Sequence, residues 1–299
     1  MSNVCFFNNR LKFVPNSKCI NLGNQEKIID ESEILFVTTT LYTKWLYYQS
    51  SIVKSLFPKS KHIWVDGTKN WPNSWFHWIN QVKNRPEKYY VLVDEDFFIT
   101  DKQAFLRCIE YMENSDCNLL GCPDGFHQFR QHNPVAINTF LMFGRIKDLS
   151  GLDFSKIQFE FNESNNEWEN SFSLKYKEDY SLDFNYHFPA EHGCRYDNYE
   201  PYYAFMWLMK EKQMKFSYLY PDFDREFKVT SPKFSPDAPS IGYHMWYTRQ
   251  WDSRMDVLGT PNIERYLKME SFLNQTFNFN APLKKLRFYL KRKLRFTDF

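Results

Sequence analysis

The chain has 299 residues, a net charge of +2 and 43% hydrophobic residues, enough for one large α/β domain or two small ones. It has only 9 glycines and contains neither a G-x-G-x-x-G nor a P-loop sequence, which argues against a glycine-rich phosphate loop. The six cysteines include no C-x-x-C pair, so small buried thiols in a reducing cytosol are favoured over a zinc site.

The sequence shows neither a membrane span nor a signal peptide. No stretch of about 18 apolar residues occurs, and the N-terminus lacks a long apolar core. We therefore predict a cytoplasmic protein.

Strand-like and helix-like segments alternate along the chain after a polar stretch over 1–33, which could add a hairpin or an edge strand. Apolar and β-branched runs predict strands at 34–39, 62–66, 89–94, 118–122, 138–143, 216–220 and 241–246. Apolar residues at helical spacing predict helices at 43–57, 72–84, after an N-cap at Asp101, and 201–214. This order predicts an α/β fold with a Rossmann-like, mostly parallel sheet and helices on both faces.

Residues 151–190 interrupt the alternation. They are acidic and aromatic, with few helix caps, and we interpret them as an insertion or a lid over the open edge of the sheet. No interdomain linker is evident. The predicted organisation is one domain over 1–281 that contains this insertion, followed by a basic segment over 282–299.

Three carboxylates, Asp94, Glu95 and Asp96, end the strand predicted at 89–94. Ligands bind at the carboxyl ends of strands in open α/β sheets. Carboxylates at i and i+2 around a tight bend suit Mg²⁺ or Mn²⁺, which prefer oxygen ligands and leave positions open for phosphates. A solvated acidic turn is the alternative, but clustered carboxylates repel one another unless a cation offsets the charge.

Two later segments carry further candidates. His244 lies in an apolar strand, where it is either a core histidine or a metal ligand, and Arg249 could bind a phosphate bidentately. Asp197 and Glu200 precede the helix at 201–214 among tyrosines. They could cap that helix, or one could act as a general base beside surfaces on which a sugar stacks.

These motifs, in this order, resemble the GT-A fold glycosyltransferases. Asp94 and Asp96 match the D-x-D of that family, His244 its late metal-binding histidine, and Asp197 or Glu200 its acidic residue on the acceptor side. The resemblance covers about residues 34–250. The segment 132–143 also looks like the donor-sugar strand of bacterial surface-polysaccharide transferases.

The resemblance implies a metal-dependent transferase that moves a sugar from a nucleotide-diphosphate sugar to a glycan or lipid-linked acceptor in surface polysaccharide synthesis. Mn²⁺ or Mg²⁺ would be held by Asp94, Asp96 and His244, with Asp94 and Arg249 beside the donor phosphates. The nucleoside would be held by Thr38, Thr39 and Asp66.

In an inverting enzyme, Asp197 or Glu200 would deprotonate the acceptor hydroxyl. The usual adjacent Glu-Asp pair is absent, so the base and the stereochemistry stay open, as do the donor, the acceptor and the oligomeric state.

Residues 282–296 combine seven cations with leucines at helical spacing. This pattern predicts a basic amphipathic helix on an anionic membrane surface, and a solvated basic tail is the alternative. The chain has no basic groove, so we do not expect nucleic-acid binding. Attachment to the inner face of the cytoplasmic membrane would suit a lipid-linked acceptor.

Two other functions share parts of this pattern. Phosphatases of the haloacid dehalogenase type also place D-x-D after an apolar strand, but usually on the first strand and followed by a small residue and Thr. Here Phe97 and Phe98 follow, on the third strand. A carbohydrate-binding protein that retains the fold without catalysis is the non-enzymatic alternative.

Overall fold

The computed structural model describes residues 29–41, 43–67, 74–124, 136–153, 202–224, 228–246 and 262–277. The predicted insertion, apart from its first three residues, and the basic C-terminal segment lie outside these ranges, as do residues 1–28. The predicted domain boundaries therefore stay predictions. None of the described helices has both the length and the apolar character needed to cross a membrane.

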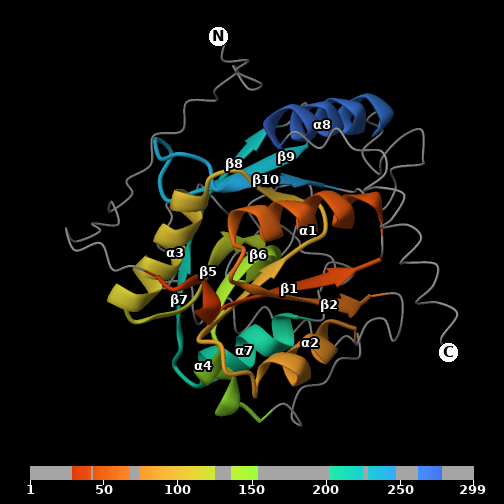
Figure 1. Ribbon diagram of the computed structural model, residues 1–299. Helices are drawn as coiled ribbons and strands as arrows, with labels where there is room; N and C mark the ends of the chain where they lie inside the picture. Colours follow the sequence, from red (N-terminus) through yellow and green to blue (C-terminus); the bar gives the residue numbers. More distant parts are fainter. Residues whose placement is uncertain are drawn as a thin grey trace, which may run out of the picture.

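A six-stranded sheet with the order β2–β1–β3–β6–β5–β7 forms the centre of the molecule (Figure 1). Its strands are β1 (Ile34–Thr40), β2 (Lys61–Asp66), β3 (Tyr89–Val93), β5 (Cys117–Pro123), β6 (Ile137–Arg145) and β7 (Lys215–Tyr218). Only β6 runs against its neighbours β3 and β5. The predicted mixed α/β fold with a mostly parallel sheet is confirmed, and its shape is compatible with a Rossmann-like arrangement.

Helices cover both faces of this sheet (Figure 1). They are α1 (Lys44–Leu56) and α3 (Lys102–Asn114) on one face, and α2 (Ser74–Val82), α4 (Ile146–Ser150) and α7 (Tyr203–Glu211) on the other. Successive side chains of a strand point to opposite faces. In β1, Phe36 accordingly joins the core beneath α1 and α3, whereas Leu35 and Val37 join the core beneath α2 and α7.

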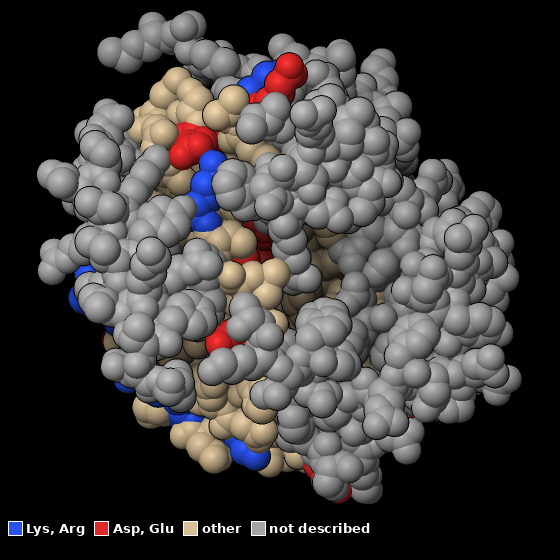
Figure 2. Space-filling view, turned by 90° about the vertical axis from the view of Figure 1, so that its right-hand side faces the viewer, with Lys and Arg blue, Asp and Glu red and all other residues tan. Residues whose placement is uncertain are grey.

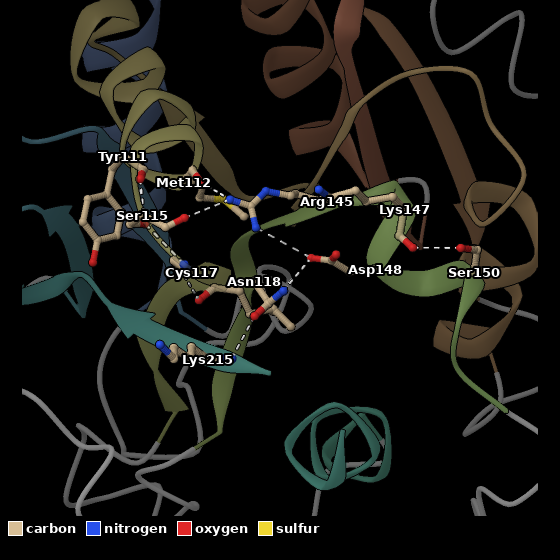
Figure 3. A network of polar contacts seen from close by, with 11 residues as sticks. Tyr111, Met112, Ser115, Cys117, Asn118, Arg145, Lys147, Asp148, Ser150 and Lys215 are labelled. Carbon is tan, nitrogen blue, oxygen red and sulfur yellow. Dashed lines mark hydrogen bonds and ion pairs between the residues drawn. The ribbon is translucent and has the colours of Figure 1, made fainter. Parts of the chain in front are cut away.

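The helix starts follow local capping chemistry. Thr43 caps α1, because its hydroxyl accepts a hydrogen bond from the Trp45 amide at 3.3 Å. Asp101 caps α3 as predicted, accepting from the Ala104 amide at 2.9 Å. At the other end of α3, the Arg145 guanidinium donates to the carbonyl oxygens of Met112 and Ser115 (Figure 3). A cation at carbonyls that lack helical partners stabilises the end of the helix.

A second, antiparallel sheet was not predicted as a sheet, although the strand predicted at 241–246 belongs to it. It has the order β4–β10–β9–β8 and consists of β4 (Phe97–Ile99), β8 (Tyr220–Asp224), β9 (Val229–Lys233) and β10 (Gly242–Met245). The helix α8 (Asn262–Phe277), also missed by sequence reasoning, lies beside α1 and this sheet (Figure 1). Its Tyr266 ring packs 5.8 Å from the Trp45 ring of α1, and its Phe272 ring 5.4 Å from Tyr243 of β10.

Candidate metal centre

The acidic triplet forms the turn that joins the two sheets. β3 ends at Val93, and the Phe97 amide donates to the Asp94 carbonyl oxygen at 3.1 Å, closing a tight turn over residues 94–97. The Asp94 amide donates to the Phe140 carbonyl oxygen of β6 at 3.0 Å. β4 then starts at Phe97 in the second sheet. The turn is therefore anchored at both ends, which fixes where its side chains project.

His244 reaches this turn through the pairing of β10 with β4. In the antiparallel register His244 lies opposite Phe97, and the Met245 amide donates to the Asp96 carbonyl oxygen at 3.1 Å. The second sheet therefore places a histidine from late in the chain directly beside the end of the third strand.

The three side chains converge on one point. His244 Nε2 lies 3.3 Å from Asp96 Oδ1 and 4.0 Å from Asp94 Oδ2. One ligand atom from each residue lies within 4.8 Å of the other two, and among the described residues this is the single group of that kind. Metal–ligand bonds of about 2.1 Å in an octahedron place adjacent ligands about 3.0 Å apart and opposite ones about 4.2 Å apart. The observed spacings therefore fit one hard divalent cation.

The site is buried on one side and open on the other. His244 is 4% exposed and Asp96 8%, whereas 35% of the Asp94 side chain is accessible. The strands β1 and β2 end on the face seen in Figure 2, where acidic atoms lie recessed in a hollow. Partial access through Asp94 would leave coordination positions for a ligand that arrives from solvent.

The imidazole of His244 is held between aromatic rings. The Phe140 ring stacks on it at a centroid distance of 4.3 Å and an angle of 5°, and Trp246 packs edge-on at 4.4 Å. Trp246 is itself fixed because its Nε1 donates to the Thr230 hydroxyl at 2.7 Å. These contacts orient Nε2 toward the two carboxylates. Nε2 is the nitrogen that faces the carboxylates, whereas Nδ1 is buried without a hydrogen-bond partner in the described part of the chain.

Glu95, the middle carboxylate, belongs to a different set of contacts. It is 6% exposed and accepts hydrogen bonds from the Thr40 hydroxyl at 2.5 Å, the Thr43 amide at 3.2 Å and the Leu41 amide at 3.4 Å. Burial raises the pKa of Glu95 to about 7; the Thr40 hydrogen bond opposes this rise and the charge of Asp96 adds to it. The sequence analysis left Glu95 out of the metal ligands but gave no sign of these contacts with residues 40–43.

The predicted nucleoside contacts lie at the ends of the first two strands. Thr39 and Asp66 are partly exposed near the open edge. Thr38 is fully buried, and its hydroxyl bonds the ring of His62 at 2.9 Å and the Gln49 amide at 3.0 Å. A nucleoside role for Thr38 stays a prediction to which the buried hydroxyl lends no support. Of the other predicted site residues, Asp197, Glu200 and Arg249 lie outside the described residues.

Sequence reasoning missed one polar cluster at the same edge of the sheet. Asp124 follows β5, is fully buried, and accepts hydrogen bonds from the Tyr202 hydroxyl at 2.6 Å and the Tyr203 hydroxyl at 2.5 Å. Asn138 also donates to Asp124, and its own side-chain oxygen accepts from the Phe140 amide. The position of Asp124 directly after a predicted strand, like that of Asp94, was the available signal.

No protein-family model matches the chain, and no curated protein shows significant sequence similarity to it. One solved structure that it resembles is described as a glycosyltransferase involved in the glycosylation of the major capsid of PBCV-1. The match has a TM-score of 0.34 and 10% sequence identity, and it covers 62% of this chain and 81% of the other. A likeness this weak assigns no function, so a proposal has to rest on the motifs and geometry of this chain.

Proposed function

We propose that the protein is a metal-dependent glycosyltransferase that moves a sugar from a nucleotide-diphosphate sugar to a glycan or lipid-linked acceptor in surface polysaccharide synthesis. The observation that carries the proposal is the convergence of Asp94, Asp96 and His244 where the third strand ends. Two carboxylates and an imidazole suit Mn²⁺, and two carboxylates with open positions also suit Mg²⁺. The chain order of these motifs, as found in GT-A enzymes, supports the same conclusion.

Each residue has a defined task under this proposal. Asp94, Asp96 and His244 would hold the divalent ion, which when bound supplies Lewis-acid stabilisation of the nucleoside-diphosphate leaving group. Thr39 and Asp66, at the ends of neighbouring strands, would bind the nucleoside. Arg249 would pair with a donor phosphate.

The residues that we propose for the acceptor are assigned from the sequence. Asp197 or Glu200 would take the proton from the acceptor hydroxyl in an inverting reaction. The basic residues 282–296 would hold the protein at the cytoplasmic face of the membrane, close to a lipid-linked acceptor. Nucleic acid has no part in this proposal.

The deciding experiment is thermal unfolding with UDP-, GDP-, CMP- and TDP-sugars, each with and without Mn²⁺. A ligand that binds only the folded state at a hundredfold excess over its Kd stabilises it by about 2.7 kcal/mol. We expect one class of nucleoside-diphosphate sugar to stabilise the chain only with Mn²⁺, and release of that nucleoside diphosphate when an acceptor glycan is supplied. Asp96→Ala should lose both effects while remaining folded.

The matched control is Asp116→Asn, which removes an exposed carboxylate whose ion pair with Lys215 lies on the surface. It should behave like the unaltered protein. An unchanged Mn²⁺-dependent shift in Asp96→Ala would remove the metal site from the proposal. Hydrolysis of a generic phosphate ester would favour the phosphatase, and glycan binding without nucleotide would favour the carbohydrate-binding protein.

A further inference from the structure

Glu95 lies between two proposed metal ligands but turns away from them. Its neighbours Asp94 and Asp96 face His244, whereas its own carboxylate crosses to the connection between β1 and α1. There it accepts from the Thr40 hydroxyl at 2.5 Å, the Thr43 amide at 3.2 Å and the Leu41 amide at 3.4 Å. Glu95 thus contacts the end of β1 and the start of α1, both outside the turn over residues 94–97, which we call the metal turn.

Hydrogen bonds hold both segments that Glu95 links, the turn over residues 94–97 and the β1–α1 connection. On one side, the turn is closed by the Phe97 amide on the Asp94 carbonyl and tied to β10 by the Met245 amide on the Asp96 carbonyl. On the other side, Thr43 is the N-cap of α1, so its amide belongs to the amino end of a 13-residue helix, where a carboxylate is favoured. A shift of the β1–α1 connection therefore displaces the Glu95 carboxylate and, through one peptide on either side, both aspartates.

The burial of Glu95 argues against a role as a surface charge or as space filling. At 6% exposure, its carboxylate has exchanged water for three donors that all belong to residues 40–43. An apolar side chain could fill the same volume without the loss of hydration. The carboxylate adds hydrogen bonds of defined direction, and these fix the distance between the metal turn and the β1–α1 connection.

We propose that Glu95 is a positioning residue, which sets the geometry of the Asp94–Asp96 metal turn by anchoring it to the β1–α1 connection at Thr40, Leu41 and Thr43. The inference rests on the proposed function, because it takes Asp94 and Asp96 as ligands of a divalent cation. Partners that orient metal ligands typically change metal affinity by about 10- to 100-fold when they are lost.

The test is titration of the full chain with Mn²⁺ alone, followed by calorimetry. Two substitutions break the anchor while keeping every carboxylate: Glu95→Asp shortens the reach, and Thr40→Val removes one donor with little change in shape. We expect each to weaken Mn²⁺ binding, Glu95→Asp by about tenfold. In the double variant the effects should not add, because both disrupt the same contact.

Other variants separate positioning from charge. Glu95→Gln removes the charge but keeps the length and one acceptor oxygen; under the inference it should bind Mn²⁺ better than Glu95→Asp. If the charge of Glu95 is all that matters, Glu95→Gln will be the weak binder, Thr40→Val will bind normally, and the inference is overturned. Ser217→Ala, which removes a hydroxyl bonded to Tyr111 on α3, is the control for loss of a single hydrogen bond.

The outcomes distinguish this inference from the proposed function. If the unaltered protein binds Mn²⁺ and Asp96→Ala does not, but Glu95→Asp and Thr40→Val both bind normally, the metal site stands and the positioning role falls. If the unaltered protein binds neither Mn²⁺ nor Mg²⁺, both fall together. A lower melting temperature with unchanged Mn²⁺ affinity would make Glu95 a merely structural residue.

Discussion

The partly buried imidazole of His62 on β2 makes the stability of the fold depend on pH. Burial lowers the pKa of His62 from 6.5 to about 4, because the charged ring is poorly solvated beside Phe36 and Trp64. The unfolded chain therefore binds this proton more readily than the folded protein does. The free energy of unfolding is highest above about pH 6.5, where His62 is neutral in both states, and it decreases as the pH falls toward 4.

We expect His62 to lower the free energy of unfolding over this interval by less than about 3 kcal/mol, because the residue is partly exposed. Urea unfolding at several pH values measures the change. In His62→Gln the slope between pH 6.5 and 4 should be shallower. Parallel curves for the two proteins would contradict the assignment.

The hydrogen bonds to Asp124 stabilise the edge of the sheet where β5 ends. Its carboxylate is fully buried, and the hydroxyls of Tyr202 and Tyr203 are two of its donors. Removing one donor from a buried acceptor leaves that acceptor less satisfied and costs about 1–3 kcal/mol. Tyr203→Phe should therefore destabilise the protein by about that amount in urea unfolding, and Tyr111→Phe, which breaks a bond to Ser217, by less. Equal losses would show that Asp124 is not the determining partner.

At the scale of elements, the site depends on how closely β10 approaches β4. Gly242 makes that approach possible, because a Cβ at this position would overlap the Phe98 carbonyl oxygen and crowd the Phe97 ring. Gly242→Ala should push the strands apart and move His244 away from Asp96. We expect weaker Mn²⁺ binding together with a lower melting temperature.

Gly151→Ala is the control, because a Cβ at 151 meets no atom within 4 Å. It should change neither quantity. Normal Mn²⁺ affinity in Gly242→Ala would show that the pairing of β4 with β10 does not set the site.

Helix α8 contacts α1, from which it is more than 200 residues distant in the sequence. Glu270 of α8 accepts a hydrogen bond from the Tyr48 hydroxyl at 2.5 Å and pairs with Lys44 at 3.0 Å, both in α1. The helix therefore joins the second sheet to the layer that covers the first. The basic segment predicted to contact membranes follows α8 in the sequence.

Replacement of Lys291, Arg292 and Lys293 by Gln should reduce sedimentation with anionic vesicles. Each cation near such a surface contributes about 1 kcal/mol, so three should weaken binding roughly a hundredfold. Vesicles of neutral lipid should bind both proteins equally weakly. The matched control replaces three exposed lysines elsewhere: Lys54, Lys147 and Lys212. Equal binding by both triple variants would contradict a specific role for the segment.

Local pattern was sufficient for much of the fold. Strands β1, β2, β3, β5, β6, β7 and β10, helices α1, α2, α3 and α7, and the Asp101 cap follow from hydrophobic periodicity and capping chemistry, both properties of neighbouring residues. The short strand β4 was missed because three residues carry too little periodicity to register. Within the second sheet, the pairing of β4 with β10 could not be predicted because it joins segments about 145 residues apart, whereas β8, β9 and β10 are consecutive in the chain.

Residue types and their spacing predict which groups could bind a cation: two aspartates around a bend after a buried strand, and a histidine in a later strand. The sequence could not establish that they meet, because the distance between Asp96 and His244 is fixed by the β4–β10 register and by the rings of Phe140 and Trp246. Nor could it show where the Glu95 side chain goes, because only the folded β1–α1 connection supplies the hydrogen-bond donors that Glu95 contacts. Composition and spacing select the chemistry of a site, whereas the pairing of β10 with β4 decides which of its candidates come together.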